Sequence, residues 1–236
     1  MVSAPLIEVF CSAQGEGPLV GVRQLFVRFA ECNLACTYCD TPLGVRENCR
    51  VERTPGSGRY ELLPNPVEAR SIGEIARSFG RVHSIALTGG EPLLYPEFIR
   101  SIETEIPLYL ESNMSLPEAA AEIRDRVRYV AGDFKLREAV GEAYEELRDR
   151  AVRCFRVLRS SGRRYTFCKL VLPERFDEDE LVSAVDELRG FVSMVVLQPV
   201  WGVRHAPREL LRVQERLLEL VDTRIIPQTH KLLGLR

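Results

Sequence analysis

Short apolar runs recur along the chain, and between most of them lie segments whose apolar residues fall three or four positions apart. The first pattern is typical of β-strands and the second of amphipathic α-helices. Six strands are predicted in this way, at residues 25–30, 84–87, 108–110, 128–134, 165–172 and 191–197. Alternation of strands and helices predicts a parallel sheet with crossover helices.

The clearest helix is expected after Lys135, where Val140, Leu147, Cys154 and Leu158 share one helical face. Other helices carry start signals. An acceptor side chain followed three residues later by Glu marks a capping box, and proline is tolerated in a first turn. These signals predict helix starts at Ser71, Ser115, Asp177 and Pro207.

About six strand–helix units fit either a doubly wound open sheet or an incomplete (β/α) barrel. The glycine-rich turn of a dinucleotide fold is missing after the first predicted strand, where the sequence reads Glu31-Cys32-Asn33-Leu34. Residues 42–70 are rich in proline and glycine and show no sustained period. We therefore expect a single domain over residues 1–236, with an insertion or long loop at 42–70.

Composition narrows the function. The 236 residues carry 32 Lys and Arg against 34 Asp and Glu, a formal net charge of −2. This balance excludes a globally basic nucleic-acid binder. The N-terminus lacks an export signal, and no apolar stretch approaches the ~18 residues needed to span a bilayer. We therefore expect a cytoplasmic protein that binds neither nucleic acid nor membrane.

In a reducing compartment, the odd count of seven cysteines favours metal binding or chemistry over disulfides. Cys32, Cys36 and Cys39 are spaced C-x3-C-x2-C directly after the first predicted strand. A structural zinc site would need a fourth ligand, for which Cys49 is a poor candidate. Three thiolates on a [4Fe–4S] cluster would instead leave one iron open to a ligand.

This spacing, with Tyr38 before the last cysteine, resembles the cluster motif of the radical S-adenosylmethionine (SAM) superfamily. Leu87-Thr88-Gly89-Gly90-Glu91-Pro92 resembles the superfamily's Gly-Gly-Glu segment at the end of the second strand. Glycine lets a backbone approach a ligand closely. The resemblance implies that the amino and carboxylate groups of SAM bind the open iron, and that an electron from the cluster cleaves SAM to a 5′-deoxyadenosyl radical.

Further motifs lie at both ends of the chain. They are Gln14-Gly15-Glu16-Gly17, Val27-Arg28-Phe29-Ala30, Cys39-Asp40-Thr41 and the segment Gln228-Thr229-His230-Lys231-Leu232-Leu233-Gly234. Together they resemble the 7-carboxy-7-deazaguanine synthases over essentially the whole chain. The resemblance implies an α/β fold of the partial (β/α)6-type TIM barrel. Cysteines, Gly-Gly-Glu and polar residues all follow predicted strands, where barrel sites lie.

The resemblance also implies an activity. It predicts a carbon–nitrogen lyase that converts 6-carboxy-5,6,7,8-tetrahydropterin to 7-carboxy-7-deazaguanine with loss of ammonia, on the route to queuosine or archaeosine. The implied cofactors are a [4Fe–4S] cluster, recycled SAM and Mg²⁺. The implied partners are the pterin, an electron donor of flavodoxin or ferredoxin type, and a second copy of the chain in a homodimer.

Carried over by position, the family's site residues fall into three groups. Substrate would be bound by Ala13, Gln14, Gly15, Glu16, Arg28, Thr88 and Arg236, with Arg28 on the substrate carboxylate. SAM would be bound by Tyr38, Cys39, Asp40, Gly90, Glu91, Asp133, Phe134, Lys135 and Gln198. Metals would be held by Cys32, Cys36 and Cys39 for the cluster and by Thr41 for Mg²⁺.

Three positions depart from the family pattern: Glu31 and Met114 stand where glycine is usual, and Arg236 replaces a terminal proline. Two other functions stay open. A radical SAM activase of a glycyl-radical enzyme would share the cysteines but not the end motifs. A non-catalytic zinc module would hold zinc in place of the cluster.

Overall fold

A computed structural model describes residues 2–236, and all six predicted strands are present in it. They lie side by side in chain order, and every neighbouring pair is parallel. They are β3 (Arg23–Phe29), β7 (Ser84–Gly89), β8 (Leu108–Ser112), β9 (Val127–Asp133), β10 (Tyr165–Leu172) and β11 (Met194–Pro199). A short strand, β12 (Thr223–Ile225), continues the series beside β11. The predicted α/β fold with a partial barrel is confirmed.

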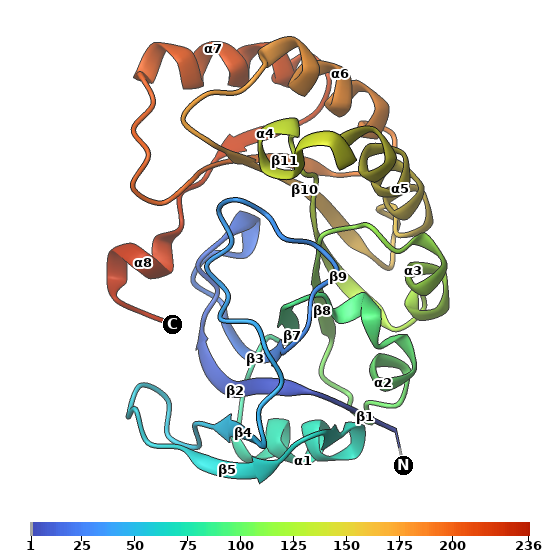
Figure 1. The fold of residues 1–236 in the computed structure, drawn as a ribbon, viewed down its shortest axis with the longest axis vertical. Helices are drawn as coiled ribbons and strands as arrows, with labels where there is room; N and C mark the ends of the chain where they lie inside the picture. The colour runs from blue at the N-terminus through green and yellow to red at the C-terminus, as the bar shows by residue number, and fades with distance from the viewer. Residues whose placement is uncertain (1) are drawn as a thin grey trace.

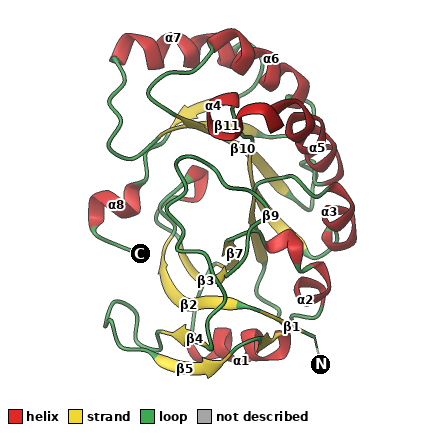
Figure 2. Cartoon of the chain, viewed as in Figure 1, coloured by secondary structure: helices red, strands yellow, loops and turns green. Residues whose placement is uncertain are grey.

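Helices cover the outer face of the curved sheet (Figures 1 and 2). They are α1 (Ala69–Ser78), α2 (Pro96–Arg100), α3 (Pro117–Ile123), α4 (Arg137–Val140), α5 (Tyr144–Val157), α6 (Glu178–Leu188) and α7 (Pro207–Leu218). The last helix, α8 (Thr229–Leu233), lies apart from these, at the open side of the barrel (Figure 1). Strand residues such as Leu110 and Leu170 and helix residues such as Ile72 and Cys154 share the larger apolar core. Among residues 2–236, no helix combines the length and apolar character that a bilayer span requires.

The N-terminal part adds strands that the sequence pattern did not reveal. β2 (Leu6–Ala13) pairs antiparallel with β3, and β4 (Asn48–Val51) and β5 (Glu61–Pro64) extend the sheet beyond β2. A separate pair joins β1 (Ser3–Ala4) to β6 (Val67–Glu68). Residues 42–70, expected as an insertion or long loop, therefore contain a β4–β5 hairpin. β5 is mostly exposed, so it lacks the apolar alternation that marks a strand.

Helix starts were predicted with mixed success. Asp177 caps α6 by accepting hydrogen bonds from the backbone N–H groups of Asp179 and Glu180, and Pro207 opens α7. The predictions at Ser71 and Ser115 were wrong, because α1 starts at Ala69 and α3 at Pro117 without a side-chain cap. Ser115 accepts instead from Asn33 of the cysteine loop. The long helix after Lys135 is broken at Gly141, whose φ is +60°, into α4, the 3-10 helix η3 (Gly141–Ala143) and α5.

Two layers of side chains fill the inside of the sheet. A second apolar cluster lies there, to which the six main strands contribute Phe26, Ala86, Tyr109, Ala131, Phe167 and Val196. Because strand side chains alternate, the residue two positions later points to the same face. These next residues are polar in every strand: Arg28, Thr88, Glu111, Asp133, Lys169 and Gln198. The barrel is therefore plugged by apolar groups below and carries a polar layer towards the carboxyl ends of its strands.

Candidate functional site

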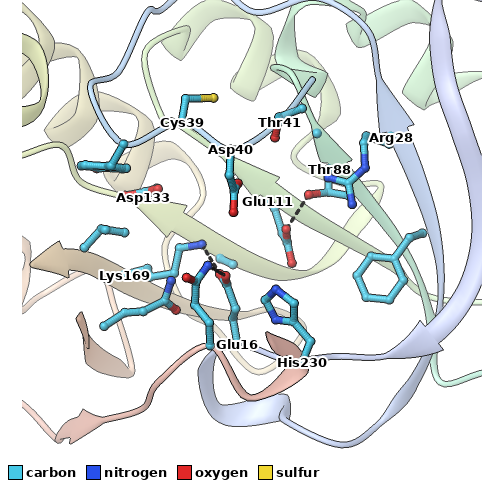
Figure 3. A pocket seen from close by; sticks show the side chains of 18 of the residues that line it. Glu16, Arg28, Cys39, Asp40, Thr41, Thr88, Glu111, Asp133, Lys169 and His230 are labelled. Carbon is cyan, nitrogen blue, oxygen red and sulfur yellow. Dashed lines mark hydrogen bonds and ion pairs between the residues drawn. The ribbon is translucent and has the colours of Figure 1, made fainter. Parts of the chain in front are cut away.

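A cavity of about 720 Å³ lies above this polar layer. Its volume is in the range usual for small-molecule sites, and its position at the carboxyl ends of the strands is that of barrel active sites. The loop after β2, the cysteine loop after β3 and the C-terminal tail complete its walls. Figure 3 shows charged side chains from these separate segments facing one space.

The predicted site residues meet in this cavity with two exceptions. Its lining includes Ala13, Gln14, Gly15, Glu16, Arg28, Cys32, Cys36, Tyr38, Cys39, Asp40, Thr41, Thr88, Gly90, Asp133, Lys135, Gln198 and Arg236. Glu91 and Phe134 do not line it, and both are buried behind its wall.

The three cysteines lie on one loop and line the same wall. Sγ of Cys32 accepts hydrogen bonds from the backbone N of Leu34 at 3.5 Å and from Nδ2 of Asn113 at 3.8 Å. Such N–H···S bonds tune thiolates that hold iron–sulfur clusters. Among residues 2–236, no three His, Cys, Asp or Glu side chains gather closely enough to hold a single metal ion. Three thiolates without a fourth donor fall short of the four ligands that structural zinc requires, whereas in a cluster each thiolate binds a different iron.

The other four cysteines lie outside the lining of the cavity. Cys11, Cys49, Cys154 and Cys168 are all buried. Buried free cysteines such as Cys154 and Cys168 behave as small apolar core residues. Cys49 lies in β4 and is fully buried, so it does not supply a fourth ligand beside the other three.

A polar cluster stands beside the cysteines. Nζ of Lys135 lies 2.7 Å from Oδ2 of Asp133 and 5.1 Å from the ring centre of Tyr38. Burial alone would lower the pKa of Lys135, but Asp133 and Tyr38 raise it above its usual range. Oδ1 of Asp133 and Oε1 of Gln198 are buried and have no hydrogen-bond partner among residues 2–236. Buried acceptors are normally paired, so these two fit the amino and hydroxyl donors of a nucleoside-like ligand such as SAM.

The two glycines after β7 are required by close packing. A Cβ on Gly90 would lie 1.9 Å from the carbonyl oxygen of Glu31, and Gly89 has a φ of +91°. No other residue fits either position without moving the backbone. The cysteine loop and the Gly-Gly segment are thereby held in direct contact, which places the backbone of Gly90 at the cavity.

Glu91 is buried next to the cavity and does not line it. Its carboxylate accepts hydrogen bonds from the backbone N–H groups of Leu93 and Asn113 and from the hydroxyl of Ser112. Burial raises the pKa of Glu91 to about 7, although these hydrogen bonds oppose the shift. Glu91 therefore joins the loop after β7 to the end of β8.

Two departures from the family pattern, Glu31 and Met114, each make contacts that fit the surrounding structure. The carboxylate of Glu31 accepts a hydrogen bond from the hydroxyl of Tyr95. Met114, where glycine is usual, has a φ of +56°, and no other non-glycine residue in the described chain has a positive φ. Its side chain is fully buried. A left-handed backbone costs a non-glycine residue free energy. Burial of the Met114 side chain offsets this cost.

Arg28 is held by a carboxylate that the sequence analysis did not identify. Glu8 of β2 is buried, and Oε1 lies 3.0 Å from Nε of Arg28 while Oε2 lies 3.0 Å from Nη2 of Arg50. Arg236 also pairs with Oε2 of Glu8. Its guanidinium lies over the ring of Phe10 at 4.7 Å. The two ends of the chain therefore meet at Glu8.

Both donors of the Gln14 amide are used within the protein. Nε2 donates to Oε1 of Gln24 at 2.8 Å and to Oε1 of Glu111 at 2.9 Å, and Oε1 accepts from the backbone N of Glu16 at 3.0 Å. Glu111 receives a second hydrogen bond, of 2.5 Å, from the hydroxyl of Thr88. Gln14 lines the cavity, but its side chain orients Glu111 rather than offering free donors.

A partly buried ion pair lies across the cavity from Arg28 (Figure 3). Nζ of Lys169 lies 2.5 Å from Oε2 of Glu16, and Nε2 of Gln228 donates to Oε1 at 2.8 Å. Burial alone would raise the pKa of Glu16, but Lys169 and Gln228 lower it to about 2. Lys169 was missed in the sequence, where its signal is a single charged residue within strand β10.

The C-terminal tail closes the open side of the barrel. The backbone N of Thr229 donates to the carbonyl of Gly15 at 2.8 Å. A Cβ on Gly15 would lie 2.1 Å from Nδ1 of His230. Nζ of Lys231 lies 2.5 Å from Oδ2 of Asp40, next to Cys39. His230 and Lys231 both line the cavity, so the tail joins the N-terminal loop to the cysteine loop.

Known proteins share this sequence and fold. The family model for the Radical SAM superfamily matches residues 27–188. The chain is 50% identical over 234 residues to the 7-carboxy-7-deazaguanine synthase of Archaeoglobus fulgidus, covering 99% of each chain. It is 37% identical over 262 residues to that of Methanothermobacter thermautotrophicus, covering 100% of this chain and 99% of the relative.

A solved structure supports the fold. The crystal structure of QueE from Escherichia coli superposes with a TM-score of 0.55 at 19% identity, over 97% of this chain and 95% of that one. The cysteine loop, Gly89 and Gly90, and residues of both end motifs lie at one cavity, and the similarity leads to a single assignment. The chain belongs to the 7-carboxy-7-deazaguanine synthase family of the radical SAM superfamily.

Proposed function

We propose that this protein converts 6-carboxy-5,6,7,8-tetrahydropterin to 7-carboxy-7-deazaguanine with release of ammonia. One observation carries the proposal. The three cysteines, Gly89 and Gly90, Arg28 and residues of both end motifs converge on a single cavity, in a chain that is 50% identical to a curated synthase of that name.

Membership of the radical SAM superfamily implies a [4Fe–4S] cluster and SAM. When bound, they supply an electron and a 5′-deoxyadenosyl radical that starts the ring contraction. Cys32, Cys36 and Cys39 would hold the cluster. The backbone of Gly90, the free oxygens of Asp133 and Gln198, and the Lys135–Tyr38 pair are suited to bind and orient SAM.

Substrate binding is proposed at the opposite wall. Arg28 would pair with the pterin carboxylate, because its planar guanidinium offers two parallel donors. The loop Ala13–Gln14–Gly15 and the side chain of Thr88 would border the ring system. The tail, ending at Arg236, would cover the bound substrate and exclude water from it.

Further parts of the proposal rest on the family alone. They are a Mg²⁺ ion at Thr41, a homodimer, a flavodoxin- or ferredoxin-type electron donor and a cytoplasmic location. Thr41 lines the cavity beside Asp40, and Mg²⁺ prefers such oxygen ligands while keeping substrate and water as others. We further propose that residues 1–236 act as one domain, with the β4–β5 hairpin as a part of it that supports the tail.

The proposal is tested by the stoichiometry of the reduced, reconstituted protein. We expect one ammonia per pterin consumed, with no net loss of SAM. Cleavage of SAM without consumption of pterin would favour an activase of a glycyl-radical enzyme. Protein purified without oxygen that contains one zinc and neither iron nor sulfide would favour the zinc module.

A further inference from the structure

Lysine is rare in this chain, and all of it lies at one place. Only Lys135, Lys169 and Lys231 occur among the 32 Lys and Arg residues. All three line the cavity. An ammonium is a compact point charge, whereas a guanidinium is a planar fork, so the two are not interchangeable where a single ligand atom is contacted. Lys135 pairs with Asp133 and Lys231 with Asp40, both near the cysteine loop. Lys169 pairs with Glu16 on another wall of the same cavity and has no assigned role.

Lys169 has donors to spare. Its ammonium carries three N–H donors, and one of them is used by Oε2 of Glu16 at 2.5 Å. No other hydrogen bond from Lys169 is found within residues 2–236. Burial alone would lower its pKa, but Glu16, Asp133 and Glu111 raise it above the usual range. The group therefore stays charged and keeps two donors for a ligand in the cavity.

The position of Lys169 suits one end of the proposed substrate. Figure 3 shows Lys169 and Glu16 on one side of the cavity and Arg28 and Thr88 on the other, with Glu111 between them. The pterin carries its carboxylate at one end. At the other end, the pyrimidine ring presents a carbonyl acceptor beside N–H and amino donors. A carboxylate held at Arg28 directs the pyrimidine edge towards the Glu16–Lys169 pair.

We propose that Lys169 selects the substrate by donating a hydrogen bond to the 4-oxo group of the pterin, while Glu16 accepts from the adjacent ring N–H or 2-amino group. This inference rests on the proposed function and adds Lys169 as a residue that recognises the pyrimidine edge of the substrate. The Lys169 ammonium offers a donor to the oxo acceptor of the pterin, and the Glu16 carboxylate offers an acceptor to its N–H donors. A 4-amino group would bring its own N–H donors against the ammonium, and a site built for a hydrogen bond rejects such a ligand strongly.

The test compares two stable ligands that do not turn over. They are 6-carboxypterin, which has the 4-oxo group, and 2,4-diamino-6-carboxypteridine, which has a 4-amino group in its place. Dissociation constants are measured by quenching of pteridine fluorescence, with anaerobic protein that carries cluster and SAM. We expect the wild type to bind the oxo ligand at least ~10-fold more tightly than the diamino ligand.

The variants separate recognition from a merely structural ion pair. Lys169→Met should weaken the oxo ligand ~10- to 100-fold and the diamino ligand hardly at all. Lys169→Met leaves the negative charge of Glu16 without its partner. The effect of Lys169 is therefore also measured in a background that lacks this charge, by comparing Glu16→Gln with the double variant E16Q/K169M. Glu16→Gln should keep the preference for the oxo ligand, and the double variant should lose it. A double variant that retains the preference, or equal weakening of both ligands by Lys169→Met, overturns the inference. Wild-type protein that binds neither ligand would instead overturn the proposed function.

Discussion

Nε of Arg28 lies 3.0 Å from Oε1 of Glu8, on the antiparallel neighbour strand. This pair uses one of the five N–H donors of the guanidinium. Among residues 2–236, no hydrogen bond is formed by the two Nη groups of Arg28. The buried carboxylate therefore fixes the arginine in the cavity while its outer donors stay available for a second carboxylate.

Arg28→Ala is expected to raise the Michaelis constant for the carboxypterin ~10- to 100-fold, because a charge-assisted pair with the substrate is lost. Uncoupled cleavage of SAM should change little, since Arg28 forms its hydrogen bond with Glu8 and, among residues 2–236, none with the cysteine loop. Arg50→Ala is the matched control, because it removes another partner of Glu8 that does not line the cavity. Equal damage to pterin turnover and SAM cleavage in Arg28→Ala would contradict the assigned role.

Gly15→Ala is expected to displace the C-terminal tail, because its Cβ would lie 2.1 Å from Nδ1 of His230. We expect faster proteolysis of the tail and at least a ~10-fold loss of kcat/KM for the pterin. Gly162→Ala serves as the control, since nothing lies within 4 Å of the added Cβ. A tail as protected in Gly15→Ala as in the control would show that Gly15 does not determine closure.

Met114→Gly should destabilise the protein despite relieving a left-handed backbone. The φ of +56° costs a non-glycine residue roughly 1–2 kcal/mol. Removing a buried methionine side chain costs roughly 2–5 kcal/mol, and glycine adds flexibility to the unfolded chain. Urea unfolding should therefore show a net loss of roughly 1–3 kcal/mol, whereas Met114→Leu should lose less than about 1.5 kcal/mol. A more stable Met114→Gly would mean that strain outweighs burial.

The Glu16–Lys169 pair predicts a pH dependence of stability. The pKa of Glu16 is lowered to about 2 in the folded protein, so its contribution is present above the unfolded value of about 4.3 and is lost as the pH falls below it. Between pH 5 and 2.5, the free energy of unfolding of the cluster-free wild type should fall more steeply than that of Glu16→Gln, by up to about 1.4 kcal/mol per unit. Glu146→Gln, which alters an exposed pair, should keep the wild-type slope. Parallel curves for wild type and Glu16→Gln would contradict the pair.

Local patterns were enough to predict the main strands and the cysteine loop, and they place Arg28 on the same face of β3 as Phe26; its role was implied by the family resemblance. Each of these is encoded by neighbouring residues, as in the alternation of Phe26 and Arg28 along β3. Other parts depend on contacts between distant segments. Glu8 interrupts an apolar run in the sequence, and only the fold shows that it meets Arg236, 228 residues away. The pairing of Lys169 with Glu16 likewise spans 153 residues, so no local pattern could reveal it.

The function itself is tested most directly by identifying the product. Reduced protein carrying cluster and SAM is incubated with 6-carboxy-5,6,7,8-tetrahydropterin and Mg²⁺ without oxygen, and the products are separated and weighed by mass spectrometry. We predict 7-carboxy-7-deazaguanine over many turnovers, formed with unconsumed SAM. An unchanged pterin beside accumulating 5′-deoxyadenosine would contradict the account.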